Sequence, residues 1–273
     1  MDYKLPKLPY RDENSNKGSF GKILNISGSK YMTGAACLSS LAALKIGAGY
    51  VEIASCDEVL KAAACYSPEI VLAPTEKIPE LINQATVLLI GCGLSTTDSA
   101  KEIFTKVIEQ RGNIPTVIDA DGLNLLSKTE YTFDGRVVLT PHPKEASRLL
   151  DCSLEDILNN FEDSARKISE KYNCVTVMKS HQTMVVSPDG RTYHNTTGNS
   201  ALAKAGSGDV LAGMIAGLIA QKADIFDAAV LGVYLHGLCG DIAKEDLTAY
   251  GVLASDTVRY IPYAIKFLLS KKM

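Results

Sequence analysis

The sequence predicts an α/β fold in which a mostly parallel sheet is covered by helices on both faces. Short apolar runs typical of buried strands alternate with helical patterns over most of the 273 residues, and such alternation builds parallel sheets. Hydrophobic residues make up 46% of the chain and charged residues 22%, an ordinary balance for a globular protein. Because no change of composition marks a second domain, we expect residues 1–16 to form a short lead and residues 17–273 a single domain.

The N-terminal part is expected to form a strand, a helix and a second strand. The apolar run KILNIS at 22–27 suits a strand. Small residues over 35–46 suit a helix, and Gly47 and Gly49 are expected to end it. The next strand is expected at 50–54.

The middle of the chain continues the alternation. The run TVLLI at 86–90 predicts a buried strand that leads into a glycine turn. A helix is expected at 99–110, followed by strands at 116–119 and 137–139. Pro-His-Pro follows the last of these strands, and the prolines delay the next helix, which we expect at 145–150.

The remaining elements are a helix, three short strands and an apolar helical region. The helix is expected at 162–171, and from Asp209 onward the chain has the pattern of helices. Polar turns separate the three strands, which are expected at 175–179, 183–187 and 192–194. The longest strongly apolar stretch, 210–220, is too short to span a bilayer.

Composition disfavours several classes of function. The chain has 28 Lys and Arg against 31 Asp and Glu, a formal net charge of −3, whereas proteins that bind nucleic acid or anionic membranes are normally basic. The seven cysteines are odd in number and lack C-x-x-C spacing, so we expect free thiols, no zinc cluster and a cytoplasmic location. We therefore expect neither nucleic acid nor a membrane as a partner.

The most informative motif is Gly206-Ser207-Gly208-Asp209, which precedes an apolar helix. Glycines let backbone N–H groups approach a ligand, and the partial positive charge of a helix N-terminus favours a phosphate or an oxyanion. Asp209 at the same place can accept a proton. The spacing is equally typical of an ordinary helix start, because Asp is a good N-cap and Gly often precedes helices.

Five further polar or glycine-rich segments follow expected strands, at 28–36, 91–95, 119–124, 139–145 and 179–183. Ligands of parallel α/β sheets bind beyond the carboxyl ends of the strands. Each segment has an ordinary alternative, as a flexible turn, a helix cap or an exposed hairpin. Together with the first motif, they indicate an enzyme or a binding protein for a nucleotide-like ligand.

Individual side chains in these segments have alternatives of their own. Asp119 can face a ligand or a Mg²⁺-bound water, whereas Asp121 can simply cap a helix. Two prolines hold His142 out of the following helix, which favours contact with a ligand. Lys179 can meet a phosphate or lie in an exposed hairpin turn. His236 lies in an apolar helical run, where we expect a core residue rather than a catalyst.

Several motifs occur together in the order found in one known family. They are Lys17-Gly18-Ser19-Phe20-Gly21, Thr33-Gly34-Ala35, Gly47-Ala48-Gly49, Gly91 to Leu94, Asp119 to Asn124, Leu139 to Glu145, Thr197 to Ser200 leading to Gly206 to Asp209, and His236-Gly237 with Ala254-Ser255-Asp256. On these motifs, which cover nearly the whole chain after Lys17, the sequence resembles the ADP/ATP-dependent NAD(P)H-hydrate dehydratase family.

The resemblance implies a ribokinase-like fold, a three-layer sandwich with a mostly parallel central sheet flanked by helices. It implies a lyase that dehydrates (6S)-hydrated NADH and NADPH. The reaction is expected to be driven by ADP, which gives AMP and phosphate, or by ATP, with Mg²⁺ bridging the phosphates. A homo-oligomer, typically a tetramer, is also implied. Since no epimerase half is expected in this chain, a separate epimerase acting on the same substrate pool is implied as well.

The resemblance also assigns roles residue by residue. Asp209 is expected to be the catalytic base, and the N–H groups of Gly206, Ser207 and Gly208 to stabilise the transferring phosphoryl group. The residues expected to line the substrate site are Ala35, Gly93, His142 and Asp209. Those expected to contact the nucleotide are Lys179, Ser180, His181, Gln182, Thr183, Asn199 and Gly208. No side chain is expected to bind the metal directly, because water and the phosphates hold it.

Two positions depart from the family pattern. Ser180 stands where relatives usually have Gly, and Ala205 stands where Gly is common, so a need for positive φ at either position would strain the turn. Two other functions stay open at this point. One is an ATP-dependent small-molecule kinase of the same superfamily that acts on a vitamin-precursor alcohol, and the other is a nucleotide-binding sensor without catalysis.

Overall fold

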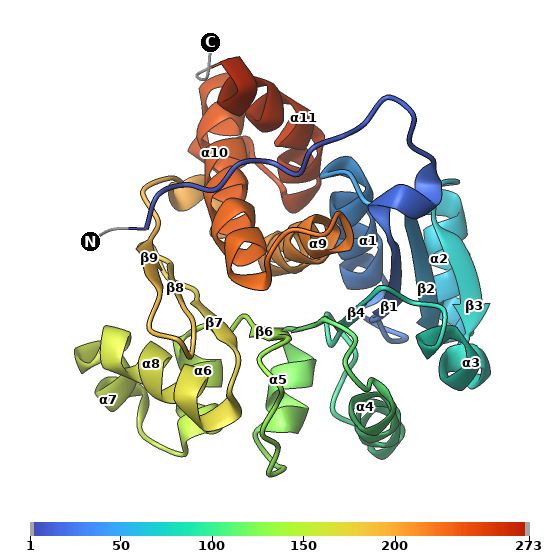
Figure 1. Cartoon of the computed structure of the whole chain (residues 1–273), viewed down its shortest axis with the longest axis horizontal. Coiled ribbons are helices and arrows are strands. Elements are labelled where there is room, and N and C mark those ends of the chain that lie inside the picture. Colours follow the sequence, from blue (N-terminus) through green and yellow to red (C-terminus); the bar gives the residue numbers. More distant parts are fainter. Residues whose placement is uncertain (1–2, 271–273) are drawn as a thin grey trace.

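The computed structural model describes residues 3–270, and all strands of the described chain belong to one nine-stranded sheet (Figure 1). The strands are β1 (Lys22–Ile26), β2 (Tyr50–Ser55), β3 (Val71–Pro74), β4 (Val87–Ile90), β5 (Thr116–Ile118), β6 (Val137–Leu139), β7 (Val175–Met178), β8 (Met184–Val186) and β9 (Thr192–His194). Their order across the sheet is β3-β2-β1-β4-β5-β6-β7-β8-β9.

The sheet is parallel from β3 to β7, and the pairs β7–β8 and β8–β9 are antiparallel. The predicted mostly parallel sheet is therefore confirmed. The carboxyl ends of the parallel strands share one edge. β1 pairs with both β2 and β4, so the strand order changes direction between β1 and β4, and this kind of switch point creates a crevice for ligands.

Helices cover both faces of the sheet (Figure 1). They are α1 (Thr33–Lys45), α2 (Asp57–Tyr66), α3 (Ile78–Ile82), α4 (Asp98–Gln110), α5 (Asp121–Leu126), α6 (Pro143–Leu150), α7 (Leu154–Asn159), α8 (Phe161–Tyr172), α9 (Ser207–Ala220), α10 (Ile225–Gly251) and α11 (Ala254–Ser270), with 3₁₀ helices at Lys17–Phe20, Thr75–Lys77 and Ser200–Leu202. The helices α1, α9, α10 and α11 lie on one face, and α3 to α8 lie on the other (Figure 1).

The central strands β4, β5 and β6 are mostly apolar because both of their faces are buried. Ile23 and Leu89 belong to the core shared with α9, α10 and α11, whereas Leu24 and Leu88 belong to the core shared with α4 and α8. Side chains that alternate between the two faces therefore fill two separate cores, which gives the expected three-layer sandwich.

Each strand and helix that the sequence predicts is present, with ends that differ by two residues or fewer. The elements that the sequence analysis missed are short or lie at an edge. β3 is a four-residue edge strand that ends in Pro74, and proline is tolerated at such an edge. The missed helices α3, α5 and α7 have five or six residues each, and α2 has ten.

Helix α10 is a longer apolar segment than 210–220, the stretch expected from the sequence to be the longest. It has 27 residues, with non-helical backbone at Thr248, and by length and composition it could cross a membrane. In this fold, 67% of its most apolar window is buried, chiefly against α9 and α11. This is the packing expected of a core helix in a globular protein.

Candidate functional site

Helix α9 begins in a glycine turn. Gly206 has a φ of +89°, and a Cβ at this position would lie 2.7 Å from Leu38 Cδ1, so the turn requires glycine. No side chain caps the helix. The N–H of Ser207 donates to the carbonyl of Lys204 at 3.2 Å, whereas the N–H of Gly208 has no partner among the described residues. An unpaired N–H at the positive end of a 14-residue helix suits an anion.

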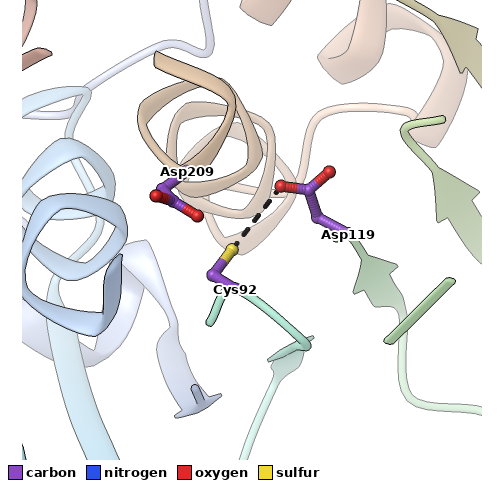
Figure 2. A group of neighbouring side chains, drawn as sticks. All are labelled: Cys92, Asp119 and Asp209. Atoms are coloured by element: carbon purple, nitrogen blue, oxygen red, sulfur yellow. Dashed lines mark hydrogen bonds between the residues drawn. The ribbon is translucent and has the colours of Figure 1, made fainter. Parts of the chain in front are cut away.

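Asp209, in the first turn of α9, meets residues from two strand ends. The thiol of Cys92, just after β4, and the carboxylates of Asp119, just after β5, and Asp209 have ligand atoms within 4.8 Å of one another (Figure 2). Cys92 Sγ lies 3.7 Å from Asp119 Oδ2. Burial and the charge of Asp119 raise the pKa of Asp209 to about 6. Asp209 is therefore ionised at neutral pH but titrates close to it, as a general base should.

Asp119 and Lys179 form a buried ion pair. Lys179 Nζ lies 2.7 Å from Asp119 Oδ1, and Thr140 Oγ1 donates to the same oxygen at 2.6 Å. Burial opposes the charge on Asp119, but the ammonium and these hydrogen bonds hold its pKa below the usual value. The sequence suggests that Asp119 faces a ligand or a Mg²⁺-bound water. Neither role involves a lysine, so the ion pair with Lys179 becomes visible only in the structure.

The ammonium of Lys179 lies next to the glycine turn. A Cβ placed on Gly208 would be 3.3 Å from Lys179 Nζ and 3.7 Å from Asp119 Oδ2. A cation, a helix N-terminus and a carboxylate base therefore converge on one point. This combination binds a phosphate and removes a proton beside it.

His142 is the N-cap of α6, so the prediction that the prolines hold it out of the helix is confirmed. Its Nδ1 accepts hydrogen bonds from the N–H groups of Lys144 and Glu145, and Glu145 Oε2 accepts one from the N–H of His142 at 2.8 Å. Burial lowers the pKa of His142. Its imidazole is therefore neutral and fixed in orientation.

Glu145 is a site residue to which the sequence analysis gave no role. Its Oε2 lies 3.9 Å from Lys179 Nζ. Burial raises the pKa of Glu145 to about 7, against the opposing charge of Lys179. The capping-box spacing His142-x-x-Glu145 is the signal that could have placed it at the site.

Ala35 and Gly93, two of the expected substrate residues, are in contact at the crevice between β1 and β4. Gly93 has a φ of +62°, and a Cβ there would lie 2.8 Å from the Cβ of Ala35. Gly28, just after β1, donates its N–H to the carbonyl of Cys92 at 2.8 Å. Ala35 and Gly93 thus lie beside Cys92, which belongs to the cluster with Asp119 and Asp209.

The segment from Ser180 to Thr183 is the turn of the β7–β8 hairpin. The side chain of Lys179 points inward, whereas Ser180, His181 and Gln182 are exposed. Thr183 Oγ1 accepts a hydrogen bond from the N–H of Ser180 at 3.2 Å. Both alternatives for residues 179–183 therefore hold, since Lys179 lies in the site and residues 180–182 are exposed in the hairpin turn.

Asn199 is committed to structural hydrogen bonds. Its Nδ2 donates to Asp241 Oδ1 on α10 at 2.8 Å, and its Oδ1 accepts from the N–H of Ala201 at 2.9 Å. Its side chain is therefore bonded to α10 and not to the cluster around Asp209. Any contact with a nucleotide requires its backbone or a change of partner.

Three questions raised by the sequence have structural answers. Neither Ser180 nor Ala205 has a positive φ, so the two departures from the family pattern cause no backbone strain. Asp121 is the first residue of α5 rather than its N-cap, and its Oδ2 accepts a hydrogen bond from the N–H of Ser95 at 2.8 Å. His236 is buried beside Ser207, with Nε2 3.2 Å from Oγ, and burial lowers its pKa to about 4, which fits the expected core role.

Comparison with known proteins gives the family and its members. A family model described as NAD(P)H-hydrate dehydratase matches residues 23–263. The ADP-dependent (S)-NAD(P)H-hydrate dehydratase of Neisseria meningitidis serogroup B is 37% identical over 253 residues, covering 90% of this chain and 85% of that protein. The bifunctional NAD(P)H-hydrate repair enzyme of Moorella thermoacetica is 36% identical over 282 residues, covering 96% of this chain. The chain spans about half the length of this bifunctional relative, 52%.

Solved structures agree on the fold. An ADP/ATP-dependent NAD(P)H-hydrate dehydratase from Bacillus subtilis, co-crystallised with ATP and Mg²⁺, matches with a TM-score of 0.85 and 31% identity, covering 95% of this chain and 94% of that one. A ribokinase-like superfamily protein from Enterococcus faecalis V583 matches with a TM-score of 0.87 and 29% identity, covering 95% and 92% of the two chains. The expected ribokinase-like fold is confirmed.

Proposed function

The chain belongs to the NAD(P)H-hydrate dehydratase family, and we propose from this that it dehydrates (6S)-hydrated NADH and NADPH at the expense of ADP. The observation that carries the proposal is the position of Asp209. Its carboxylate lies in the first turn of α9, next to the unpaired N–H of Gly208 and within the cluster formed with Cys92 and Asp119. A base next to an anion site is what phosphorylation of a substrate hydroxyl requires.

In this mechanism Asp209 acts first as a general base. It takes the proton of the ring hydroxyl while the oxygen attacks the terminal phosphorus of ADP, so that an O–P bond forms and the bond to AMP breaks. Phosphate then leaves with the electrons of its C–O bond, and the adjacent ring carbon loses a proton. The ring double bond is restored, and the products are NAD(P)H, AMP and phosphate.

The glycine turn and Lys179 stabilise the transferring phosphoryl group. The N–H groups of Gly206 and Gly208 donate to its oxygens, and the ammonium of Lys179 offsets their charge. The N–H of Ser207 is already bonded to the carbonyl of Lys204, so it joins them only if that bond opens. Asp119 keeps the ammonium in place through its 2.7 Å ion pair.

The residues present fit Mg²⁺ carried on the nucleotide phosphates. Cys92, in the cluster with Asp119 and Asp209, offers a thiol, which is a soft donor that Mg²⁺ does not favour. The carboxylates of Asp119 and Glu145 are oxygen acceptors, which suit the water ligands of Mg²⁺. In this proposal no side chain binds the ion directly. When bound, Mg²⁺ neutralises phosphate charge during transfer.

The two ligands meet at Asp209. Ala35, Gly93 and the neutral His142 line the site of the hydrated dinucleotide. Lys179 and the hairpin turn through Ser180, His181, Gln182 and Thr183 contact ADP, and Asn199 and Gly208 complete that site through their backbones. ATP is an alternative donor, which the ATP and Mg²⁺ complex of the Bacillus subtilis relative supports.

The wider setting follows from the same family assignment. We propose a homotetramer in the cytoplasm, working with a separate epimerase that interconverts the two hydrate epimers. The name of the bifunctional relative supports a two-step repair pathway. Sedimentation measures the oligomeric state directly.

The proposal is tested by incubation of the protein with (6S)-hydrated NADH and either ADP or ATP, following NADH absorbance. Recovery of NADH with one phosphate released per NADH supports it. ATP-driven phosphorylation of an alcohol, without NADH recovery, indicates the superfamily kinase instead, and nucleotide binding without either reaction indicates a sensor.

A further inference from the structure

Three polar side chains join the segments that follow β4, β5 and β6. Asp121 and Asn124 lie on α5, and Arg148 lies on α6. Asp121 Oδ2 accepts a hydrogen bond from the N–H of Ser95 at 2.8 Å, and Asp121 Oδ1 accepts one from Asn124 Nδ2 at 3.3 Å. Asn124 Oδ1 accepts one from Arg148 Nη1 at 2.7 Å. Asp121, Asn124 and Arg148 thus form a polar bridge that runs from the turn after β4, through α5, to α6.

Both ends of the polar bridge lead to residues proposed to line the substrate site. Ser95 belongs to the same turn as Gly93, two residues before it, and Gly93 is in contact with Ala35. At the other end, Arg148 lies on α6, a helix of eight residues whose N-cap is His142. The polar bridge therefore sets the position of Gly93 relative to His142 through the backbone of the turn and of the helix.

The backbone held by the polar bridge is strained. Ser95 has a φ of +71°, and Ala120, which precedes Asp121, has a φ of +48°. Residues other than glycine keep such conformations only where the surrounding structure holds them. The turn after β4 also packs closely on α5, because a Cβ placed on Gly91 would lie 2.5 Å from the backbone nitrogen of Gly122. The hydrogen bond from the Ser95 N–H to Asp121 helps to hold the turn in this conformation.

We propose that Asp121, Asn124 and Arg148 are positioning residues for the hydrated dinucleotide. They hold the turn after β4 and the start of α6 at the spacing that this substrate needs, and such preorganisation raises affinity because less ordering is left to occur on binding. The ADP side is held by a different contact, the ion pair of Lys179 with Asp119. The inference rests on the proposed function and goes beyond it by assigning substrate affinity to side chains that act through others.

The test compares Arg148→Met and Asn124→Ala with a matched control, Arg136→Met. The control removes an exposed guanidinium that donates to the carbonyl of Asn113 at 3.3 Å, just before β6 and thus at its other end. We expect both bridge variants to raise KM for (6S)-hydrated NADH about three- to tenfold, the effect of one lost hydrogen bond. Both kcat and KM for ADP should stay within about twofold of the wild type, because only substrate binding is lost.

Arg136→Met should keep wild-type values of all three constants, and Arg148→Lys, which keeps a donor, should recover part of the loss. An equal rise in KM for ADP would overturn the proposal, because it indicates a general loosening of the fold. Wild-type KM for the hydrate in both bridge variants would overturn it as well.

A double variant decides whether Arg148 acts through Asn124. If it does, Arg148→Met combined with Asn124→Ala should raise KM for the hydrate no further than Asn124→Ala alone. Effects that multiply in the double variant would show that Arg148 acts on the substrate independently, as in a direct contact with its phosphates, and would overturn the positioning role.

Hydrogen exchange gives a readout that does not depend on turnover. Peptides that cover residues 91–97 should exchange faster in Arg148→Met and Asn124→Ala than in the wild type and Arg136→Met. Asp121→Ala, which removes the acceptor of the Ser95 N–H outright, should give the largest increase. Unchanged exchange in all three bridge variants contradicts the inference, whereas failure of the wild type to recover NADH contradicts the proposed function instead.

Discussion

Lys179 Nζ lies 2.7 Å from Asp119 Oδ1, and the pair joins the carboxyl ends of two strands that are not neighbours. Thr140, after the intervening strand β6, donates to the same carboxylate oxygen. Three successive strand ends are thereby held together, directly beside Gly208 and the start of α9. The pair fixes a cation under the proposed phosphate site, and the carboxylate keeps its charge in a buried position.

Removal of the ammonium should destabilise the fold strongly. Lys179→Met leaves Asp119, 1% exposed, as a buried unpaired charge, and the expected loss in free energy of unfolding is about 3–5 kcal/mol. Urea unfolding at pH 7 measures it. Arg166→Met is the control, since it breaks an exposed pair with Glu162 at 2.6 Å and should cost less than about 1 kcal/mol. Equal losses for the two variants would contradict a buried role for Lys179.

Asp209→Asn should lose activity and gain stability. The raised pKa of about 6 means that the folded protein holds the Asp209 proton more tightly than the unfolded chain. Stability from this proton is complete below the ordinary value of 3.8 and is lost as pH rises through about 6. The neutral amide should therefore stabilise the fold at pH 7 by up to about 3 kcal/mol.

The same variant should lose about 10²–10⁴-fold in turnover, the usual contribution of a general base. Thermal or urea unfolding at pH 7 and at pH 4 checks the first part, because the gain should nearly vanish at the lower pH. If Asp209→Asn is less stable than the wild type at pH 7, burial of the ionised Asp209 carboxylate does not destabilise the fold, and the prediction is wrong.

The pH profile of kcat/KM should have an acid limb with a midpoint near 6. Below it Asp209 is protonated and cannot act as the base, so activity should fall about tenfold per pH unit. Glu145, whose pKa is raised to about 7, is the other candidate for this limb. Glu145→Gln separates the two, since the limb should stay near 6 in that variant. A limb that disappears with Glu145 would assign the titration to that residue.

Cys92 should tune the base rather than react. Burial raises the pKa of its thiol well above the usual value, so it stays a neutral donor beside Asp119 and Asp209, and its hydrogen bond lowers the pKa of Asp209. Cys92→Ala should therefore move the acid limb of kcat/KM to higher pH, whereas Cys92→Ser, which keeps a donor, should leave it nearer the wild-type position. Loss of activity in both variants at every pH would instead indicate a direct chemical role for the sulfur.

The glycine turn should tolerate change at one position and not at the next. Gly206→Ala places a side chain at a φ of +89° and against Leu38, at a cost of about 1–2 kcal/mol for the backbone alone, and it should raise KM for ADP. Ala205→Gly, where φ is not positive, should cost less than about 1 kcal/mol. Equal effects in unfolding and in KM for ADP would mean that the turn conformation does not matter.

The sequence predicts the strands, their carboxyl-end turns and the motif around Asp209, because hydrophobic period and glycine spacing are local properties. It does not predict that Lys179 turns inward. That contact joins residues 60 apart in the chain and depends on β5, β6 and β7 being neighbours. The position of Cys92 beside Asp119 and Asp209 could not be predicted for the same reason, since these two neighbours come from other elements. Asn199 shows the reverse case, because a residue assigned to the nucleotide has its side chain bonded to Asp241.

The most direct test of the central claim is the stoichiometry of the ADP-driven reaction in the wild type and in Asp209→Asn. Wild-type protein mixed with (6S)-hydrated NADH and ADP should give one NADH, one AMP and one phosphate per turnover. Asp209→Asn, still folded by circular dichroism, should give almost none. NADH recovery by Asp209→Asn at the wild-type rate, or by the wild type without consumption of nucleotide, would contradict the account.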